Sequence, residues 1–142
     1  MTWWSVDPGQ IHVGVAVWDK NMLVEVYETD PSLFVDSIYS RSPEMVVIES
    51  FTLSGSHYSR AKAKQAEATL KLIGFVQFSS VFLNFQVLEQ QPSVRHVAQR
   101  SPYWTKLISD YPLKGNSHVR SAVSHGVYFL NFTPTGKSIR DK

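Results

Sequence analysis

Two acidic side chains follow short apolar runs of the sequence, and their type and position suit the binding of a metal ion or a phosphate. Asp7 follows the run Trp3–Val6 and precedes a Pro-Gly turn, and Glu49 follows the run Met45–Ile48. Carboxylate oxygens are the ligands that hard divalent cations prefer in proteins. An isolated acid is also common in ordinary turns. The hypothesis therefore requires that both acids meet at one edge of a sheet, together with further polar partners.

A histidine near the start of the last predicted helix is the third candidate. Asn116 and Ser117 are both suitable N-caps for this helix. Along it, His118 and His125 share one stripe, and Ser121 lies about one turn after His118. His125 has two interpretations: it supports His118 from behind the site, or it is a hydrogen-bonded core histidine.

The elements that must position these residues alternate between strands and helices. Apolar alternation predicts three antiparallel strands first, and Gly14 inside the second strand indicates the close approach of a helix or a ligand. Asp30 or Ser32 caps the first helix, and a strand buried on both faces leads to Glu49. The predicted strands are 3–6, 11–18, 22–28, 45–48 and 84–88. The predicted helices start at 30–32 and stop at 42–43, then cover about 59–79, 93–99 and about 116–132, with a turn or two over 103–108 in a loop-rich segment and a frayed tail over 133–142.

The long helix over about 59–79 carries small residues that keep parts of its surface thin. Its predicted packing face contains Ala66, Leu70, Ile73 and Gln77. Two explanations fit this surface: packing on the sheet alone, or packing together with a contact to a second copy of the chain.

The composition favours one domain over residues 1–142, because 43% of the 142 residues are hydrophobic and can form a proper core. There is no cysteine, which excludes disulfides and thiolate zinc sites. We recognise no signal peptide and no apolar span of about 18 residues, so we expect a soluble, cytoplasmic protein without a membrane partner.

Charge is distributed unevenly along the sequence. Residues 1–56 carry two basic and eight acidic side chains, whereas residues 57–142 carry twelve basic and four acidic ones. A basic half of this size favours a polyanionic partner such as a nucleic acid. Solvated helix faces also collect lysine and arginine, so charge alone does not identify the partner.

The motifs and the order of elements together resemble the RuvC-type Holliday-junction resolvases, most of all their bacteriophage members. The segment Asp7–Gly14 resembles the first motif, an acid and Pro-Gly followed by four residues and a glycine. Val47–Phe51 resembles the second motif, Gln91–Arg95 the segment after the fifth strand, and His118–Ala122 the last motif. The resemblance covers nearly the whole chain. It implies a ribonuclease H-like α/β fold with a mixed five-stranded sheet flanked by helices.

The resemblance also implies a divalent-metal-dependent endodeoxyribonuclease with catalytic residues Asp7, Glu49, His118 and Ser121. In-line hydrolysis of a phosphodiester uses one ion to generate hydroxide and another to stabilise the leaving oxygen. Asp7 would bridge two Mg²⁺ or Mn²⁺ ions, Glu49 would bind one or both, and His118 would complete a metal shell or position water. Ser121 replaces the final aspartate of the family with a weaker, neutral ligand. Either one ion binds less tightly, or water replaces the carboxylate, or catalysis is reduced or lost.

The implied reaction is the resolution of four-way DNA junctions by paired cuts, which requires two active sites and hence a homodimer. Lys106 or Lys114 would lie near the scissile phosphate. Phe51 and Tyr58 would wedge against unstacked bases, although Phe51 is explained equally well as a cover for the core. The residues expected to contact DNA are Phe51, Tyr58, Arg60, Lys62, Lys64, Lys106, Lys114 and Arg120.

Two alternatives remain open at this point. One is a branched-DNA-binding homologue that has lost turnover through Ser121. The other is a YqgF-like RNA nuclease, which shares the early Asp-x-Gly hairpin. If the chain is encoded by a bacteriophage, we expect it in the cytoplasm of the bacterial host. Comparing cleavage of four-way DNA, flaps and structured RNA would distinguish the alternatives.

Overall fold

The computed structural model describes residues 1–51, 60–111, 113 and 117–142, and its centre is a five-stranded mixed sheet. The strand order is β3-β2-β1-β4-β5. The first three strands form an antiparallel meander, and β4 and β5 continue the sheet parallel to β1. The mixed sheet predicted from the sequence is confirmed. The strands are β1 (Thr2–Asp7), β2 (Val13–Asp19), β3 (Met22–Thr29), β4 (Met45–Glu49) and β5 (Gln86–Gln90).

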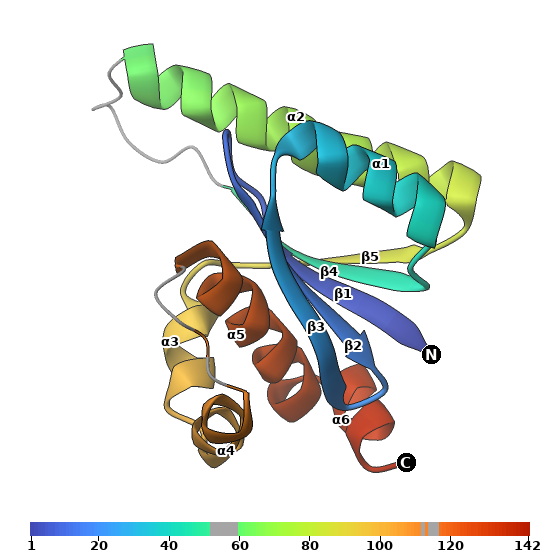
Figure 1. Cartoon of the computed structure of the whole chain (residues 1–142), viewed down its shortest axis with the longest axis vertical. Helices are drawn as coiled ribbons and strands as arrows, with labels where there is room; N and C mark the ends of the chain where they lie inside the picture. Colours follow the sequence, from blue (N-terminus) through green and yellow to red (C-terminus); the bar gives the residue numbers. More distant parts are fainter. Residues whose placement is uncertain (52–59, 112, 114–116) are drawn as a thin grey trace.

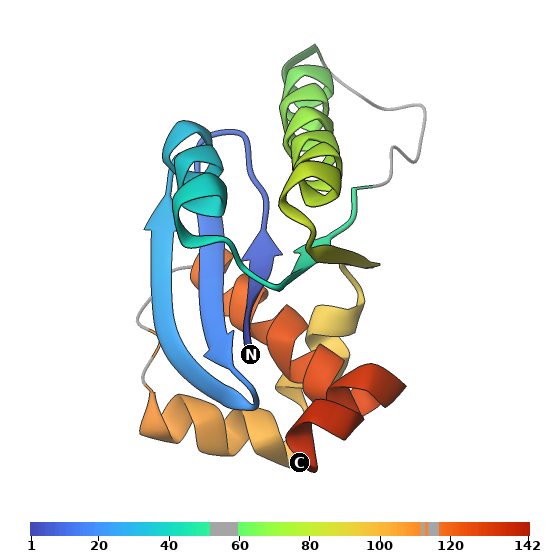
Figure 2. The same cartoon turned by 90° about the vertical axis from the view of Figure 1, so that its right-hand side faces the viewer.

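Helices cover both faces of this sheet (Figures 1 and 2). On one face lie α1 (Pro31–Arg41) and α2 (Arg60–Leu83). On the other face α5 (Ser117–Phe132) packs against the strands. Around α5 lie α3 (Val94–Gln99), α4 (Pro102–Asp110) and α6 (Pro134–Arg140). The result is a three-layer α/β architecture.

The side chains of β1 divide the core into two clusters. Trp3 packs with Trp18 beneath α5, whereas Trp4 packs beneath α1 and α2. Successive residues of a strand point to opposite faces, so two adjacent tryptophans supply both cores. The rings of Trp3 and Trp18 stack with their centroids 5.1 Å apart, and Trp18 Nε1 donates a hydrogen bond to Ser5 Oγ at 2.9 Å. The tryptophans thus fill both faces of the sheet.

Two glycines allow α5 to lie directly against β2. A Cβ added at Gly14 would overlap the backbone carbonyl of His118, and a Cβ added at Gly126 would overlap the ring of Trp18. Gly14 pairs with Asp7 in the β1–β2 ladder. The missing side chain at position 14 therefore brings the start of α5 beside the end of β1. The close helix approach predicted at Gly14 is confirmed.

Two helices occupy segments for which the sequence pattern predicts mainly loop and tail. Helix α4 is longer than the predicted turn over 103–108, and α6 replaces the predicted frayed tail, which was wrong. Both helices begin with a hydroxyl cap followed by proline. Ser101 Oγ accepts from the N–H of Trp104, and Thr133 Oγ1 accepts from the N–H of Gly136. These caps stabilise short helices that have little hydrophobic periodicity of their own.

Helix α2 ends four residues later than predicted, and its predicted packing face is confirmed only at Ala66 and Ile73. Leu70 and Gln77, which were expected on the packing face, are exposed. Thr69, Leu72 and Val76 are buried in their place, so the buried stripe is rotated around the helix relative to the predicted one. The buried residues described in this helix are Ala66, Thr69, Leu72, Ile73, Val76 and Ser79.

The segment Ala63–Leu83 of α2 is long and apolar enough to cross a membrane, by length and composition only. This corrects the expectation that the sequence contains no such span. In the structure 33% of its most apolar window is buried in the protein. Because a sheet-packing helix meets the same criteria, this property assigns no location to the chain.

Candidate active site

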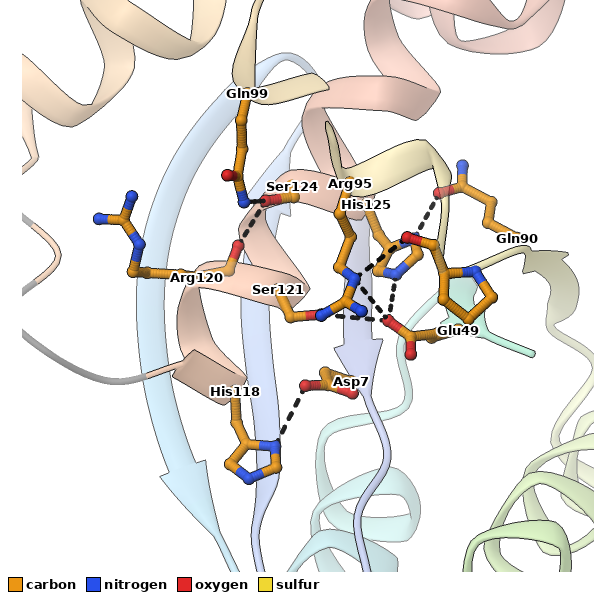
Figure 3. Close-up of polar contacts among 11 residues, drawn as sticks. Asp7, Glu49, Gln90, Arg95, Gln99, His118, Arg120, Ser121, Ser124 and His125 are labelled. Carbon is orange, nitrogen blue, oxygen red and sulfur yellow. Dashed lines mark hydrogen bonds and ion pairs between the residues drawn. The ribbon is translucent and has the colours of Figure 1, made fainter. Parts of the chain in front are cut away.

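Asp7 and Glu49 end two neighbouring parallel strands, so their carboxylates come to the same edge of the sheet. The parallel ladder between β1 and β4 pairs Val6 with Ile48, and the two acids are the next residues along each strand. Figure 3 shows both side chains beneath the first turns of α5. The positioning that the sequence pattern requires of these two acids is therefore present.

Asp7 is held by the first turn of α5. His118 Nδ1 lies 3.1 Å from Asp7 Oδ2, and the carboxylate is only 13% exposed. Burial raises the pKa of the Asp7 carboxyl, and the nearby charge of Glu49 raises it further. His118 and Arg95 oppose this rise without cancelling it. Asp7 is thus a partly buried acid whose ionised form is only partly compensated by positive charge.

Glu49 has the opposite electrostatic environment, because three donors converge on its Oε2. His125 Nε2 lies at 2.7 Å, the hydroxyl of Ser121 donates at 3.1 Å, and Arg95 Nε lies at 3.4 Å. Burial would raise the pKa of this carboxyl, but the hydrogen bond from His125, the charges of His125 and Arg95, and the bond from Ser121 together lower it. Glu49 is therefore fixed in its ionised form, with its donors gathered on one oxygen (Figure 3).

His125 orients Glu49 from inside the core. Its side chain is completely buried, and its Nδ1 lies 2.8 Å from the side-chain oxygen of Gln90. Because Gln90 pairs with Glu49 in the β4–β5 ladder, the ring is held between two neighbouring strand ends and α5. The interpretation of His125 as a hydrogen-bonded core histidine is confirmed, whereas the candidate-site residue that it contacts is Glu49 and not His118.

A cleft of about 570 Å³ opens beside these carboxylates. Its lining residues come from the β1–β2 turn, the end of β4 and the start of α5, together with α2, and they include His12, Glu49, Phe51 and His118. The rings of His12 and His118 lie 5.9 Å apart, so the histidine of the β1–β2 hairpin also borders the site. Among the described residues, the buried hydroxyl of Ser50 has no hydrogen-bond partner. The cleft gives a substrate access to Glu49 and His118.

The donor set fits a divalent cation in one respect and differs from the expected site in another. Asp7 and Glu49 lie at adjoining strand ends, and burial together with the charge of Glu49 destabilises the ionised form of Asp7. A hard divalent cation bound between them would offset this repulsion. In the part of the chain that the structure describes, however, no three His, Asp or Glu side chains form a ready metal cluster. His118 contacts Asp7, whereas Glu49 is engaged by Arg95, Ser121 and His125. The residues provide a carboxylate pair rather than a complete cage.

Among the described residues, the basic side chains expected to contact DNA are not gathered at the carboxylates. Lys64 is exposed on α2, and Lys106 is exposed on α4, which lies at the opposite end of the molecule from α2 (Figures 1 and 2). Arg120 points away from Asp7 and Glu49 (Figure 3). Its guanidinium lies 5.5 Å from the ring centre of Trp104. Tyr58 and Lys114 lie outside the described residues, as do the side chains of Arg60 and Lys62.

The structure adds Arg95 and Gln90 to the residues around the carboxylates and gives Phe51 a position beside them. Arg95 belongs to the segment that resembles the family motif after the fifth strand, but its charge gives no sign in the sequence that it reaches Glu49. Gln90 is the last residue of β5, and strand order alone places it beside Glu49. Phe51 is partly buried, packs against the α1/α2 core cluster and lines the cleft, so both of its proposed roles fit its position.

Comparisons with known proteins identify the class of fold. No protein-family model matches the sequence, and no curated protein matches it. Solved structures do match. Thermus thermophilus RuvC in complex with Holliday junction substrate aligns with a TM-score of 0.65 and 14% identity, and the alignment covers 91% of this chain and 92% of that chain. The same bacterium's RuvC alone matches at TM-score 0.62 and 14% identity over 93% of that chain.

A viral structure matches as well. The fowlpox virus resolvase in complex with substrate Holliday junction DNA aligns at TM-score 0.60 and 13% identity, over 91% of this chain and 96% of that one. The protein therefore has a ribonuclease H-like α/β fold, as predicted. Within that class its arrangement of sheet and helices is similar to that of RuvC. At these identities the similarity establishes the fold, and the expected bacteriophage branch stays a prediction.

Proposed function

We propose that the protein is a structure-selective DNA endonuclease that resolves four-way junctions by divalent-metal-dependent phosphodiester hydrolysis. The observation that carries this proposal is the meeting of Asp7 and Glu49 at adjoining strand ends beside an open cleft. The fold is similar to that of RuvC and of the fowlpox resolvase, both of which have structures in complex with Holliday junctions. Fold and carboxylate pair thus point to the same reaction.

In this proposal Asp7 and Glu49 hold Mg²⁺ or Mn²⁺. Mg²⁺ is commonly bound through one or two carboxylates, with water and substrate phosphate oxygens filling the remaining positions, so a complete protein cage is not needed. When bound, the ion would lower the pKa of a water ligand and polarise the scissile phosphate. His118 holds the Asp7 carboxylate in place through the 3.1 Å contact, and its role as a further metal ligand remains part of the proposal.

We propose that DNA is bound mainly through its phosphates. Lys64 and Lys106 are exposed at opposite ends of the molecule, and a four-way junction has arms long enough to reach both. Phosphate contacts of this kind make the DNA-binding constant depend on salt. The logarithm of this constant falls with the logarithm of the salt concentration, with a slope of about −0.9 for each phosphate neutralised. Replacing either lysine with glutamine should make that slope less steep by about 0.9, the contribution of one phosphate contact. An unchanged slope would remove the residue from the DNA surface.

Paired cutting of opposed strands requires a homodimer, and α2 offers a suitable surface. Phe78, Val81 and Phe82 are 63%, 78% and 67% exposed, and the two phenylalanine rings lie 4.9 Å apart. Apolar clusters at the surface commonly mark interfaces between proteins. Val81→Asp should convert the dimer to a monomer in light scattering, whereas Val24→Asp, at an exposed valine of β3, should not. A wild-type monomer at working concentration would contradict this assignment.

The activity is tested with a labelled four-way junction, incubated with Mg²⁺ or Mn²⁺ and compared with linear duplex, flaps and structured RNA. We expect paired nicks in the junction, and loss of nicking in Asp7→Asn. Asp36→Asn is the matched control, because Asp36 is an exposed acid on α1. Cleavage confined to RNA would favour the RNA nuclease instead.

One observation favours a second candidate, a branched-DNA-binding protein without turnover. Ser121 offers a hydroxyl where the family has its last aspartate, and that hydroxyl is donated to Glu49. Tight junction binding by the wild type, with no nicking in either metal, would support this candidate and exclude the nuclease. Gel-shift and cleavage measurements on the same samples distinguish the two.

A further inference from the structure

The guanidinium of Arg95 lies between two side chains that the proposed chemistry would otherwise assign to metal binding. Its Nε is 3.4 Å from Glu49 Oε2, and its Nη1 donates to Ser121 Oγ at 3.5 Å. Nε also donates to the carbonyl of Pro92 at 3.1 Å, which ties the side chain to the turn that precedes α3. Arginine remains protonated at any working pH. A fixed positive charge therefore occupies the side of Glu49 that faces α5 (Figure 3).

Ser121 explains why this side of Glu49 would not attract a divalent cation. The residue is buried, and its hydroxyl donates to the same Glu49 oxygen that Arg95 and His125 approach. A hydroxyl that is already donating, beside a guanidinium, offers a divalent ion no negative charge. The ion would also be repelled by Arg95 at short range. On the Asp7 side, by contrast, the two carboxylates end neighbouring parallel strands, and the like charge of Glu49 is only partly offset by His118 and Arg95.

We propose that the site binds one divalent ion, between Asp7 and Glu49, and that the guanidinium of Arg95 replaces the second ion. This inference deepens the proposed nuclease function and rests on it. Arg95 would supply positive charge to a substrate phosphate through its free N–H groups, as guanidinium groups do with phosphate oxygens. Arg95 and Ser121 thus act as a pair. The small, neutral side chain of Ser121 leaves space for the guanidinium, and Arg95 provides the positive charge.

The inference is tested by counting Mn²⁺ ions on the apo protein, which does not require activity. We expect about one equivalent per chain by calorimetric titration, and one anomalous peak per chain in crystals soaked with Mn²⁺. Ser121→Asp should still bind about one ion, because the new carboxylate would pair with Arg95. The double variant Arg95→Gln/Ser121→Asp should bind about two, because the carboxylate is present and the competing charge is gone.

Controls separate this inference from the proposed function. Arg100→Gln changes an exposed arginine just after α3 and should leave the count unchanged. Asp7→Asn should weaken Mn²⁺ binding at least tenfold if the carboxylate pair is the metal site. Two ions on the wild type, or two on Ser121→Asp alone, would overturn the role of Arg95 while leaving the nuclease proposal intact. No ion on the wild type would contradict the metal-dependent nuclease itself. Circular dichroism melts show whether each variant is folded.

Discussion

The backbone carbonyl of His118 packs directly against Gly14, at the point where Gly14 pairs with Asp7 across β1 and β2. The contact sets the distance between the first turn of α5 and the end of β1. It also places the His118 ring where Nδ1 reaches the Asp7 carboxylate. The contact between His118 and Asp7 therefore requires a glycine at position 14.

Gly14→Ala should separate these two elements. The new Cβ overlaps backbone rather than a flexible side chain, so α5 must move, at a cost of about 1–3 kcal/mol in the free energy of unfolding. Urea unfolding measures the cost, and the imidazole NMR signal of His118 reports the loss of its contact with Asp7. Gly74→Ala on α2 is the control, since an added Cβ there meets nothing within 4 Å. An unchanged stability in Gly14→Ala would contradict the packing described.

Asp7→Asn should stabilise the protein at neutral pH. Burial and Glu49 raise the pKa of Asp7 above its ordinary value of 3.8, so the folded protein holds this proton more tightly than the unfolded chain does. The contribution of Asp7 to stability is therefore lost as the pH rises from 3.8 through the raised folded value. Thermal melts across this range should show the advantage of the variant growing with pH. A variant less stable than wild type at neutral pH would refute the sign.

Glu49→Gln should have the opposite effect. His125, Arg95 and Ser121 lower the pKa of Glu49, so its ionised form stabilises the fold above the ordinary value of 4.5 and loses that effect as the pH falls through the lowered folded value. The neutral amide should cost about 1–3 kcal/mol at neutral pH, because donors to a buried carboxylate are left with a weaker acceptor. Denaturant titrations at neutral and acid pH measure this, and the deficit should shrink on acidification.

His125→Leu should affect the site through Glu49. We expect a 10- to 100-fold loss of metal affinity or turnover, as is typical when a hydrogen bond that orients a ligand is removed. The carboxyl carbon signal of Glu49, followed by NMR against pH, should show its pKa rising in the variant. His125→Gln keeps an N–H donor and should restore part of both properties. If the Glu49 titration is the same in His125→Leu, the histidine only fills the core.

Local patterns in the sequence were sufficient to predict most of the sheet. Alternation along β1 to β3 and the apolar run of β4 were correctly interpreted, and Asp30 is the one of the two predicted caps that α1 uses. The caps of α4 and α6 were also present in the sequence, but short polar helices next to loops lack the periodicity that identifies longer ones. The packing stripe of α2 was misjudged because its apolar residues are spread around the helix, and only the sheet selects which of them are buried.

The candidate site was predictable where it depends on strand ends, and less so where it depends on long-range packing. Asp7 and Glu49 follow apolar runs, and His118 lies in a recognisable motif. Arg95 and His125 reach Glu49 across 46 and 76 residues of sequence, through the order of β4 and β5 and the placement of α5. No local pattern encodes such contacts.

Helix α5 packs closely on β2 at two separate points. Near the start of α5 the carbonyl of His118 lies against Gly14 of β2, and further along α5 Gly126 lies against the ring of Trp18 of β2. Two contact points along α5 restrict both its translation along the sheet and its rotation on it. His118, Ser121 and His125 therefore keep the same relative positions before a ligand binds. Pre-organisation of this kind spares the entropy of ordering when a partner binds. In the proposed junction-resolving function, adaptation to differently shaped junctions would then fall to the opposite face of the sheet rather than to this helix.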